Sequence, residues 1–265
     1  MNHRTNLLVR QTHLAMNRRN RIMKPTRLKA ALLAVAAHLH FAINATAATQ
    51  IDIAGPAGSE QFGSAVAVLP NGNIVVTDPY YDAPGPIADV GAVHLYNSAG
   101  VLISTMTGGT AGDRVGSNGI RVLRNGHYVV RSSLWKNGTA AEAGAATWCN
   151  GTTGCSGTVS PANSLVGTTA GDHVGRFVSA LANGHYVARS IDWDNGTIVN
   201  AGVATWCNGT TGCTGPVSSA NSLVGSTAED QIGNDGIQVL PNGNYVLSSS
   251  KWDNGGIADA GASTW

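Results

Sequence analysis

Acidic side chains recur in the loops of this chain at spacings that bring hard oxygen ligands together. Asp192 and Asp194 lie two residues apart, and Asp253 occupies a corresponding loop further along. Carboxylate oxygens are the ligands that calcium prefers, so this set is a candidate ion or ligand site. The alternative is turn chemistry, because Asp and Asn hydrogen-bond their own backbone in tight turns. Lys136 replaces the second Asp in another copy of the loop, which favours turns.

Three tryptophans, Trp135, Trp193 and Trp252, stand beside these acidic loops. Each comes shortly before an Asn-Gly step, so the three rings could form a rim on which sugar rings stack. The alternative is that each ring packs between neighbouring sheets, as recurrence in several copies favours. Together the three tryptophans and three aspartates form the candidate ligand-binding set.

The chain carries no pattern typical of catalysis. It has no G-x-S-x-G, no H-E-x-x-H and no phosphate-binding G-x-x-x-x-G-K motif. Asp113, Asp172 and Asp230 recur at equivalent positions, where we expect them to accept backbone N–H bonds or to line an axial channel. Residues copied in every unit are expected to serve the unit itself. The sequence therefore favours a protein that is not an enzyme and has no cofactor.

The four cysteines form two identical C-x5-C pairs, Cys149 with Cys155 and Cys207 with Cys213. In an exported protein such pairs are expected to be two local disulfides. A zinc site is the alternative, but the usual shorter cysteine spacing and partner histidines are missing.

These residues sit in a tandem repeat. GAATWCNGTTGC at 144–155 returns as GVATWCNGTTGC at 202–213, with 58 residues between Trp148 and Trp206 and 59 between Trp206 and Trp265. Each copy shows four strand signals, including an Asn-Gly step that predicts a two-residue type I′ hairpin. Four short antiparallel strands in about 58 residues predict a blade of a β-propeller.

Landmarks divide the chain into units of about 57–110, 111–169, 170–227 and 228–265, within a repeat region of 49–265. Residues 49–55 resemble the last strand of a unit, while the last unit ends after its third strand. Pairing of 50–54 beside 261–265 would close a four-blade ring. The alternative is a fragment of a longer array.

Residues 1–47 read as a signal peptide, with a basic flank, an apolar run from Ala30 and small residues at 45–47. Met23 is an alternative start, and an uncleaved N-terminal anchor is an alternative reading. No other segment predicts a membrane span.

The first unit, with Phe62-Gly63, Asn71–Pro79 and Gly91–Tyr96, resembles the FG-GAP repeat of integrin-α-type propellers. The later units resemble a bacterial β-propeller repeat of unknown function, on NGNYVLSSSKWDNG at 242–255 and GVATWCNGTTG at 202–212. This resemblance covers nearly all of 56–265 and implies secreted or haemagglutinin-like surface proteins. The FG-GAP calcium loop is matched in no unit, so calcium binding does not carry over, and the cysteines depart from the repeat pattern.

The formal net charge is only +1, and much of the basic excess lies near the N-terminus, so the repeats offer no basic surplus for nucleic acid or anionic lipid. We expect a secreted or surface-bound bacterial module that binds an extracellular protein or glycan. The alternatives are a glycan-active hydrolase or lyase and a passive structural array.

Overall fold

The computed structural model describes residues 50–85 and 87–265, which form 17 short β-strands in four sheets and contain no helix. This confirms the all-β prediction. The expected signal peptide at 1–47 lies outside the described residues.

The first sheet contains the strands of the first unit. They are β1 (Ala65–Val68), β2 (Ile74–Asp78), β3 (Ala92–Tyr96) and β4 (Leu102–Thr107), each antiparallel to the next. A fifth strand, β8 (Gly157–Thr158), comes from the second unit and pairs with β4 in parallel.

The second sheet repeats this plan with β5 (Ile120–Val122), β6 (Tyr128–Ser132), β7 (Ala145–Cys149) and β9 (Leu165–Val166). Its fifth strand is β13 (Gly215–Pro216), which belongs to the third unit and pairs with β9 in parallel. Strands β8 and β13 therefore each connect one unit to the sheet of the preceding unit by backbone hydrogen bonds.

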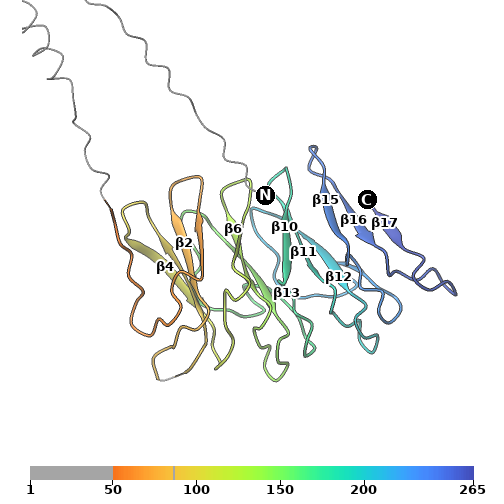
Figure 1. Ribbon diagram of the computed structural model, residues 1–265, viewed down its shortest axis with the longest axis horizontal. Coiled ribbons are helices and arrows are strands. Elements are labelled where there is room, and N and C mark those ends of the chain that lie inside the picture. The colour runs from red at the N-terminus through yellow and green to blue at the C-terminus, as the bar shows by residue number, and fades with distance from the viewer. Residues whose placement is uncertain (1–49, 86) are drawn as a thin grey trace, which may run out of the picture. The chain divides into compact units, whose positions relative to one another are not determined.

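The third sheet consists of β10 (Phe177–Ala180), β11 (Tyr186–Ser190), β12 (Val203–Cys207) and β14 (Leu223–Val224). The fourth consists of β15 (Gly236–Val239), β16 (Tyr245–Ser249) and β17 (Ala262–Thr264). Figure 1 shows the sheets of residues 51–265 following one another in chain order.

The core lies between successive sheets. Strand β6 shows why, because Tyr128 and Val130 join the cluster shared with the first sheet, whereas Val129 joins the cluster shared with the third. Alternate side chains of a strand point to opposite faces, so a middle sheet buries both faces. A third cluster, which includes Leu181 and Leu247, joins the last two sheets.

The described residues form no closed ring. Strand β17 pairs only with β16 in a three-stranded sheet, and residues 50–54 belong to no strand. A Cβ built on Gly100 would lie 3.1 Å from Ile51 and 3.5 Å from Ile53, so this segment lies against the first unit. The expected pairing of 50–54 beside 261–265 is therefore not observed.

The Asn-Gly hairpins also differ from the prediction. Gly72 has φ +85°, whereas Asn71 is absent from the residues with positive φ, so the turn is not type I′. The Gly72 N–H donates to the Leu69 carbonyl, and the Leu69 N–H donates to the Asn73 carbonyl. This is a three-residue loop that ends in a left-handed glycine. The Asn71 carboxamide oxygen accepts the Asn73 N–H at 3.1 Å, which leaves its NH2 group free to reach the next unit.

Candidate functional site

The structure buries two of the three candidate tryptophans. Trp135 is 5% exposed and Trp193 is 4% exposed, each within a cluster between sheets, and Trp252 packs partly buried against the third cluster. A sugar ring cannot stack on a ring that neighbouring side chains already cover. The expectation that Trp135 and Trp193 form a rim for stacking sugar rings is therefore wrong. Both rings instead pack between neighbouring sheets, which was the alternative.

Two of the candidate aspartates organise their own loops. The Asp194 carboxylate accepts the Asn200 N–H at 2.8 Å, and the Asp253 carboxylate accepts the Asp259 N–H at 2.8 Å. Both bonds close loops that contain a residue with positive φ. This is the turn chemistry offered as the alternative to ion binding.

Asp192 contacts a histidine and an arginine. Its carboxylate oxygen lies 3.0 Å from His173 Nδ1 and 2.6 Å from Arg176 Nη1. His173 Nε2 lies 3.1 Å from a carboxylate oxygen of Glu142 in the preceding unit. The group therefore bridges two units, and the described residues hold no group of three or more His, Cys, Asp or Glu side chains arranged to bind a metal ion.

The recurring Asp113, Asp172 and Asp230 are buried and accept backbone hydrogen bonds, as predicted. Asp172 Oδ2 accepts the N–H groups of Thr168 and Thr169 at 2.8 Å, and Asp172 Oδ1 accepts the Asp194 N–H at 3.1 Å. These bonds hold the first residues of the unit against the loop that follows Trp193. They do not leave the carboxylates facing a channel.

Two of these aspartates differ in pKa. Burial raises the pKa of Asp172 even though three backbone N–H groups donate to it. Burial also acts to raise the pKa of Asp230, but bonds from the Thr227 hydroxyl and from three backbone N–H groups outweigh it, so that pKa is lowered. The Thr227 hydroxyl lies 2.6 Å from Asp230 Oδ1, whereas the described hydrogen bonds to Asp172 all come from backbone N–H groups.

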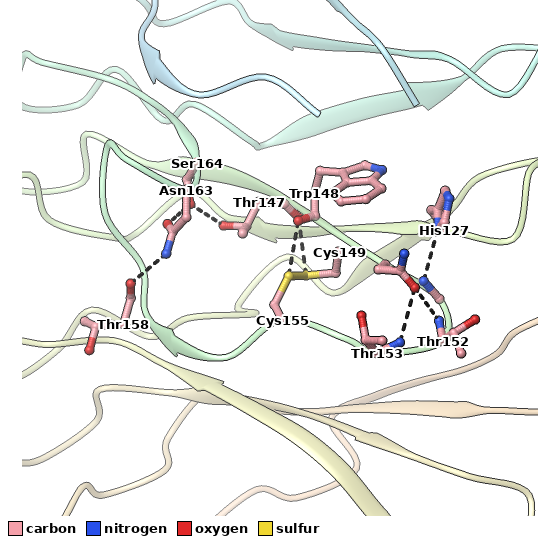
Figure 2. The surroundings of a disulfide bond; sticks show 12 residues. His127, Thr147, Trp148, Cys149, Thr152, Thr153, Cys155, Thr158, Asn163 and Ser164 are labelled. Carbon is pink, nitrogen blue, oxygen red and sulfur yellow. Dashed lines mark hydrogen bonds between the residues drawn. A yellow bond between two sulfur atoms is a disulfide. The ribbon is translucent and has the colours of Figure 1, made fainter. Parts of the chain in front are cut away.

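Both predicted disulfides are present, Cys149–Cys155 and Cys207–Cys213. Figure 2 shows the first, with Trp148 and His127 beside the turn that it closes. Within the turn, the Asn150 carboxamide oxygen accepts the N–H groups of Thr152 and Thr153 at 2.8 and 3.2 Å. The disulfide and the asparagine together define a compact, rigid turn.

Each disulfide-closed turn contacts the preceding unit through the carbonyl group of a glycine. The Gly209 carbonyl accepts Asn125 Nδ2 at 2.7 Å and Trp148 Nε1 at 2.8 Å, both from the second unit. A Cβ on Gly209 would lie 1.8 Å from the Gly184 carbonyl oxygen, so no other residue fits. The Gly151 carbonyl is held in the same way by Asn71 of the first unit, at 2.9 Å. The turns are thus connectors between units.

Three arginines line a pocket of about 250 Å³ between the second and third sheets. Arg121 comes from β5, Arg131 from β6 and Arg189 from β11, and the Arg189 guanidinium lies 4.7 Å from the centre of the Phe177 ring. Arg121 Nε donates to the Val178 carbonyl at 3.0 Å, and Arg131 Nη1 to the Arg176 carbonyl at 3.3 Å. Backbone carbonyls thus hold two of the guanidinium groups across the interface between these units, and Arg189 Nη1 donates to the Gly233 carbonyl of the fourth unit.

Within the described residues, no carboxylate forms an ion pair with the arginines of this pocket. The ion pairs found in residues 50–85 and 87–265 involve Arg114, His173 and Arg176, and none reaches the three pocket arginines. The buried Nε atoms of Arg131 and Arg189 have no hydrogen-bond partner. Burial and then the charge of Arg121 lower the pKa of Arg131, and burial lowers that of Arg189. The pocket therefore holds three positive charges without a carboxylate partner, and its backbone carbonyls leave those charges un-neutralised, which favours an anion.

The sequence interpretation did not single out these arginines, although a signal existed. Arg131 and Arg189 occupy the fourth position of YVVRS and YVARS, where the equivalent residues of the first and last units are Thr77 and Ser248. All 15 carboxylates lie after residue 51, together with only half of the 16 basic residues. The available signal was a positively charged residue within a strand that is otherwise apolar, in a region where acidic residues outnumber basic ones.

Across the part of the chain that the structure describes, no helix is long and apolar enough to cross a bilayer.

Comparison with known proteins returns families and structures without an assigned activity. No curated protein matches the chain. A crystal structure of a protein of unknown function from Bacteroides caccae is similar at 18% identity, over 74% of this chain and 58% of that one, with a TM-score of 0.34. The chain thus spans less than two thirds of that protein.

A family model described as a repeat of unknown function, DUF5650, matches residues 122–176, 180–234 and 239–265. The matches start 58 and 59 residues apart, which is the period of the tryptophans. Together they cover more than half of the sequence, so the chain belongs to the DUF5650 family of repeats of unknown function.

Proposed function

We propose that this chain is an exported, non-catalytic β-repeat module that binds an acidic extracellular ligand, protein or glycan, in the arginine pocket. The observation that carries the proposal is the set of three arginines without a carboxylate partner, in a region where carboxylates outnumber basic residues. Guanidinium groups present paired N–H donors that match carboxylate and sulfate oxygens.

Export to the cell surface or the medium is part of this proposal. Two disulfides support it, because such bonds persist mainly in oxidising compartments. The basic and apolar pattern of residues 1–47 points the same way. The finer architecture that we propose is an open array of propeller-type blades related to FG-GAP repeats, since each full unit supplies four strands of its own.

Binding to acidic polymers tests the proposal directly. The chain from residue 48 should bind polygalacturonate or dextran sulfate and not neutral dextran, with an affinity that falls as salt rises. Arg131→Gln and Arg189→Gln should each weaken binding roughly tenfold, because one charge-assisted hydrogen bond contributes about 1.5–3 kcal/mol. Lys251→Gln is the matched control, since Lys251 is exposed and lies outside the pocket.

The alternatives predict other outcomes. A passive array binds neither polymer, and a calcium titration leaves it unchanged. A glycan-active enzyme shortens the polymer, and its activity falls when Asp172 or Asp230 is replaced. Binding without turnover that disappears in the arginine variants supports the interaction module, whereas equal binding by these variants contradicts it.

A further inference from the structure

A second cavity shares a wall with the arginine pocket. It has a volume of about 570 Å³, and Arg121 lines both this cavity and the arginine pocket. Its other basic residue is Arg124, three positions further along the chain. None of the described residues that line either cavity is acidic. Four arginines therefore line the two cavities together, and we call this surface the arginine track (Arg121, Arg124, Arg131 and Arg189).

The first strands of successive sheets converge on the second cavity. Strand β5 supplies Arg121 and Val122, β10 supplies Ala180, and β15 supplies Val239. Pro70, which follows β1, also lines the cavity. Each of these four strands is the edge strand of its sheet. The cavity is therefore built from all four units and lies where the edges of their sheets come together.

The two arginines of this cavity keep most of their hydrogen-bond donors. A guanidinium group carries five N–H donors. Arg121 uses its Nε to donate to the Val178 carbonyl at 3.0 Å. Across the part of the chain that the structure describes, Arg124 makes no hydrogen bond and no ion pair. Both side chains are exposed, so their remaining donors are accessible to an anion from solvent.

The repeat does not explain why these two positions are basic. The residues equivalent to Arg121 in the other units are Ala67, Ser179 and Gln238, and those equivalent to Arg124 are Pro70, Ala182 and Pro241. The unit folds without a charge at either position, because three of the four units have none. The buried aspartates, by contrast, recur and hold the unit together. A ligand outside the fold is the better explanation for these charges.

Apart from its arginines, the second cavity is lined by aliphatic side chains, which are Pro70, Val122, Leu123, Ala180 and Val239. Among the described residues, no hydroxyl, carboxamide or aromatic side chain lines it. A bound sugar would bury hydroxyl groups against these walls without partners, which costs free energy. An aliphatic side chain of a peptide would instead gain free energy from the same contact. The lining therefore favours an acidic peptide over an acidic glycan.

We propose that the arginine track binds an extended peptide segment that carries two carboxylates with aliphatic side chains between them. One carboxylate binds in the arginine pocket and the second binds at Arg124, while the aliphatic side chains contact Val122, Ala180 and Val239 in the second cavity. This inference rests on the anion binding proposed above and names the chemical class of the ligand. Guanidinium groups suit this role because they bind carboxylates through paired N–H donors.

Pairing each peptide carboxylate with one arginine tests the proposal. Binding of the end-blocked peptide Glu-Val-Leu-Glu to the oxidised chain is measured by calorimetry, beside the peptide Glu-Val-Leu-Gln. The peptide with two carboxylates should bind roughly tenfold more tightly than the peptide with one. In Arg124→Gln this advantage should disappear, while the affinity for Glu-Val-Leu-Gln stays unchanged. Arg131→Gln should weaken the binding of both peptides.

The aliphatic walls are tested by Val239→Thr, which keeps the shape of the side chain and adds a hydroxyl group. This change should weaken the binding of Glu-Val-Leu-Glu roughly threefold and leave the binding of Glu-Ser-Ser-Glu unchanged. Val68→Thr is the matched control, because Val68 lies in another edge strand, is 68% exposed and lines neither cavity. It should change the affinity for neither peptide.

Three results would overturn the proposal. The first is equal affinity of Arg124→Gln and the unchanged chain for Glu-Val-Leu-Glu. The second is equal affinity of the unchanged chain for Glu-Val-Leu-Glu and Glu-Ser-Ser-Glu. The third is tighter binding of digalacturonate, which carries the same two charges, because it would assign the track to acidic glycans. In each case, weaker binding of acidic polymers by Arg131→Gln would still support the proposed anion site, so the two failures are separate results.

Discussion

Replacing Gly209 by alanine tests whether the disulfide-closed turn is the connector between units. The new Cβ would lie 1.8 Å from the Gly184 carbonyl oxygen and 3.1 Å from Asn125 Nδ2. Gly184 lies in the β10–β11 hairpin of the third unit, the same unit as the turn, and its backbone cannot yield as a flexible side chain does. The turn must therefore shift from the position in which its carbonyl meets the second unit. Gly209 has no positive φ, and the effect therefore reports the steric conflict and not backbone strain.

The expected loss can be worked from the contacts. Moving the turn breaks the bonds that Asn125 Nδ2 and Trp148 Nε1 make to the Gly209 carbonyl. Each contributes about 1 kcal/mol, and overpacking adds about 1–3 kcal/mol, so Gly209→Ala should lower the free energy of unfolding by roughly 3–5 kcal/mol. For a region of this size, that loss of free energy corresponds to a fall of roughly 6–20 °C in the melting temperature.

The assay is thermal unfolding of the oxidised chain, followed by tryptophan fluorescence and circular dichroism. Gly151→Ala should behave alike, because its Cβ would lie 1.9 Å from the Gly126 carbonyl oxygen. Gly256→Ala is the control, since it has open space around it and no positive φ, and it should change stability by less than about 0.5 kcal/mol. A Gly209→Ala protein as stable as Gly256→Ala would refute the connector role.

Three further predictions concern the disulfides, the buried aspartates and the buried tryptophans. Replacing both Cys207 and Cys213 by alanine should lower stability by about 2 kcal/mol, the loop-entropy value for seven closed residues, and mild reduction should then have no further effect on this turn. At neutral pH Asp230→Asn should cost about 2 kcal/mol in urea unfolding, and Asp172→Asn should cost less, because only Asp230 is more acidic folded than unfolded. Asp230 therefore stabilises the fold above its unfolded pKa, and this contribution is lost as the pH falls through its folded pKa. Asp172 favours folding when it is protonated, and that contribution is lost as the pH rises through its raised pKa. The two variants should therefore change the dependence of the free energy of unfolding on acidic pH in opposite directions. Trp193→Ala should cost about 3–5 kcal/mol, as expected for a large buried ring, and an unchanged melting temperature would contradict its placement in the core.

The strand content was predictable because it depends on local patterns. Each copy carries strand signals around an Asn-Gly step, and in the third unit the structure forms β10 and β11 on either side of that step. The cysteine pairing was equally local, since the two cysteines of each pair are six positions apart. The recurring aspartates were expected to accept backbone N–H bonds or to line an axial channel, and the structure shows the backbone bonds.

The connections between units could not be predicted in this way. Strands β8 and β13 have only two residues each, and they pair in parallel with the sheet of the preceding unit. Two residues carry no periodicity, so the sequence pattern predicted only the four antiparallel strands of each unit. The hairpin type was mistaken for a related reason: the Asn-Gly step fits both a two-residue and a three-residue loop, and the longer hydrogen-bonded loop forms here.

Repetition separates the two classes of polar residue in this chain. Asp113, Asp172 and Asp230 appear in three units and make the same backbone bonds in each, so their conformation is explained by the unit itself. Arg131 and Arg189 appear only in the two middle units, and no carboxylate in the described residues explains their charge.

The arginine pocket exists only where these two middle units meet. Arg121 and Arg131 come from the second unit, and Arg189 and Phe177 come from the third. Either unit alone keeps its buried aspartates and its disulfide but loses part of the pocket. Anion binding should therefore depend on the connection between the units: Gly209→Ala, which alters no residue of the pocket, should weaken binding of the acidic polymers together with stability. Unchanged binding in that variant would show that the pocket does not need the docked turn.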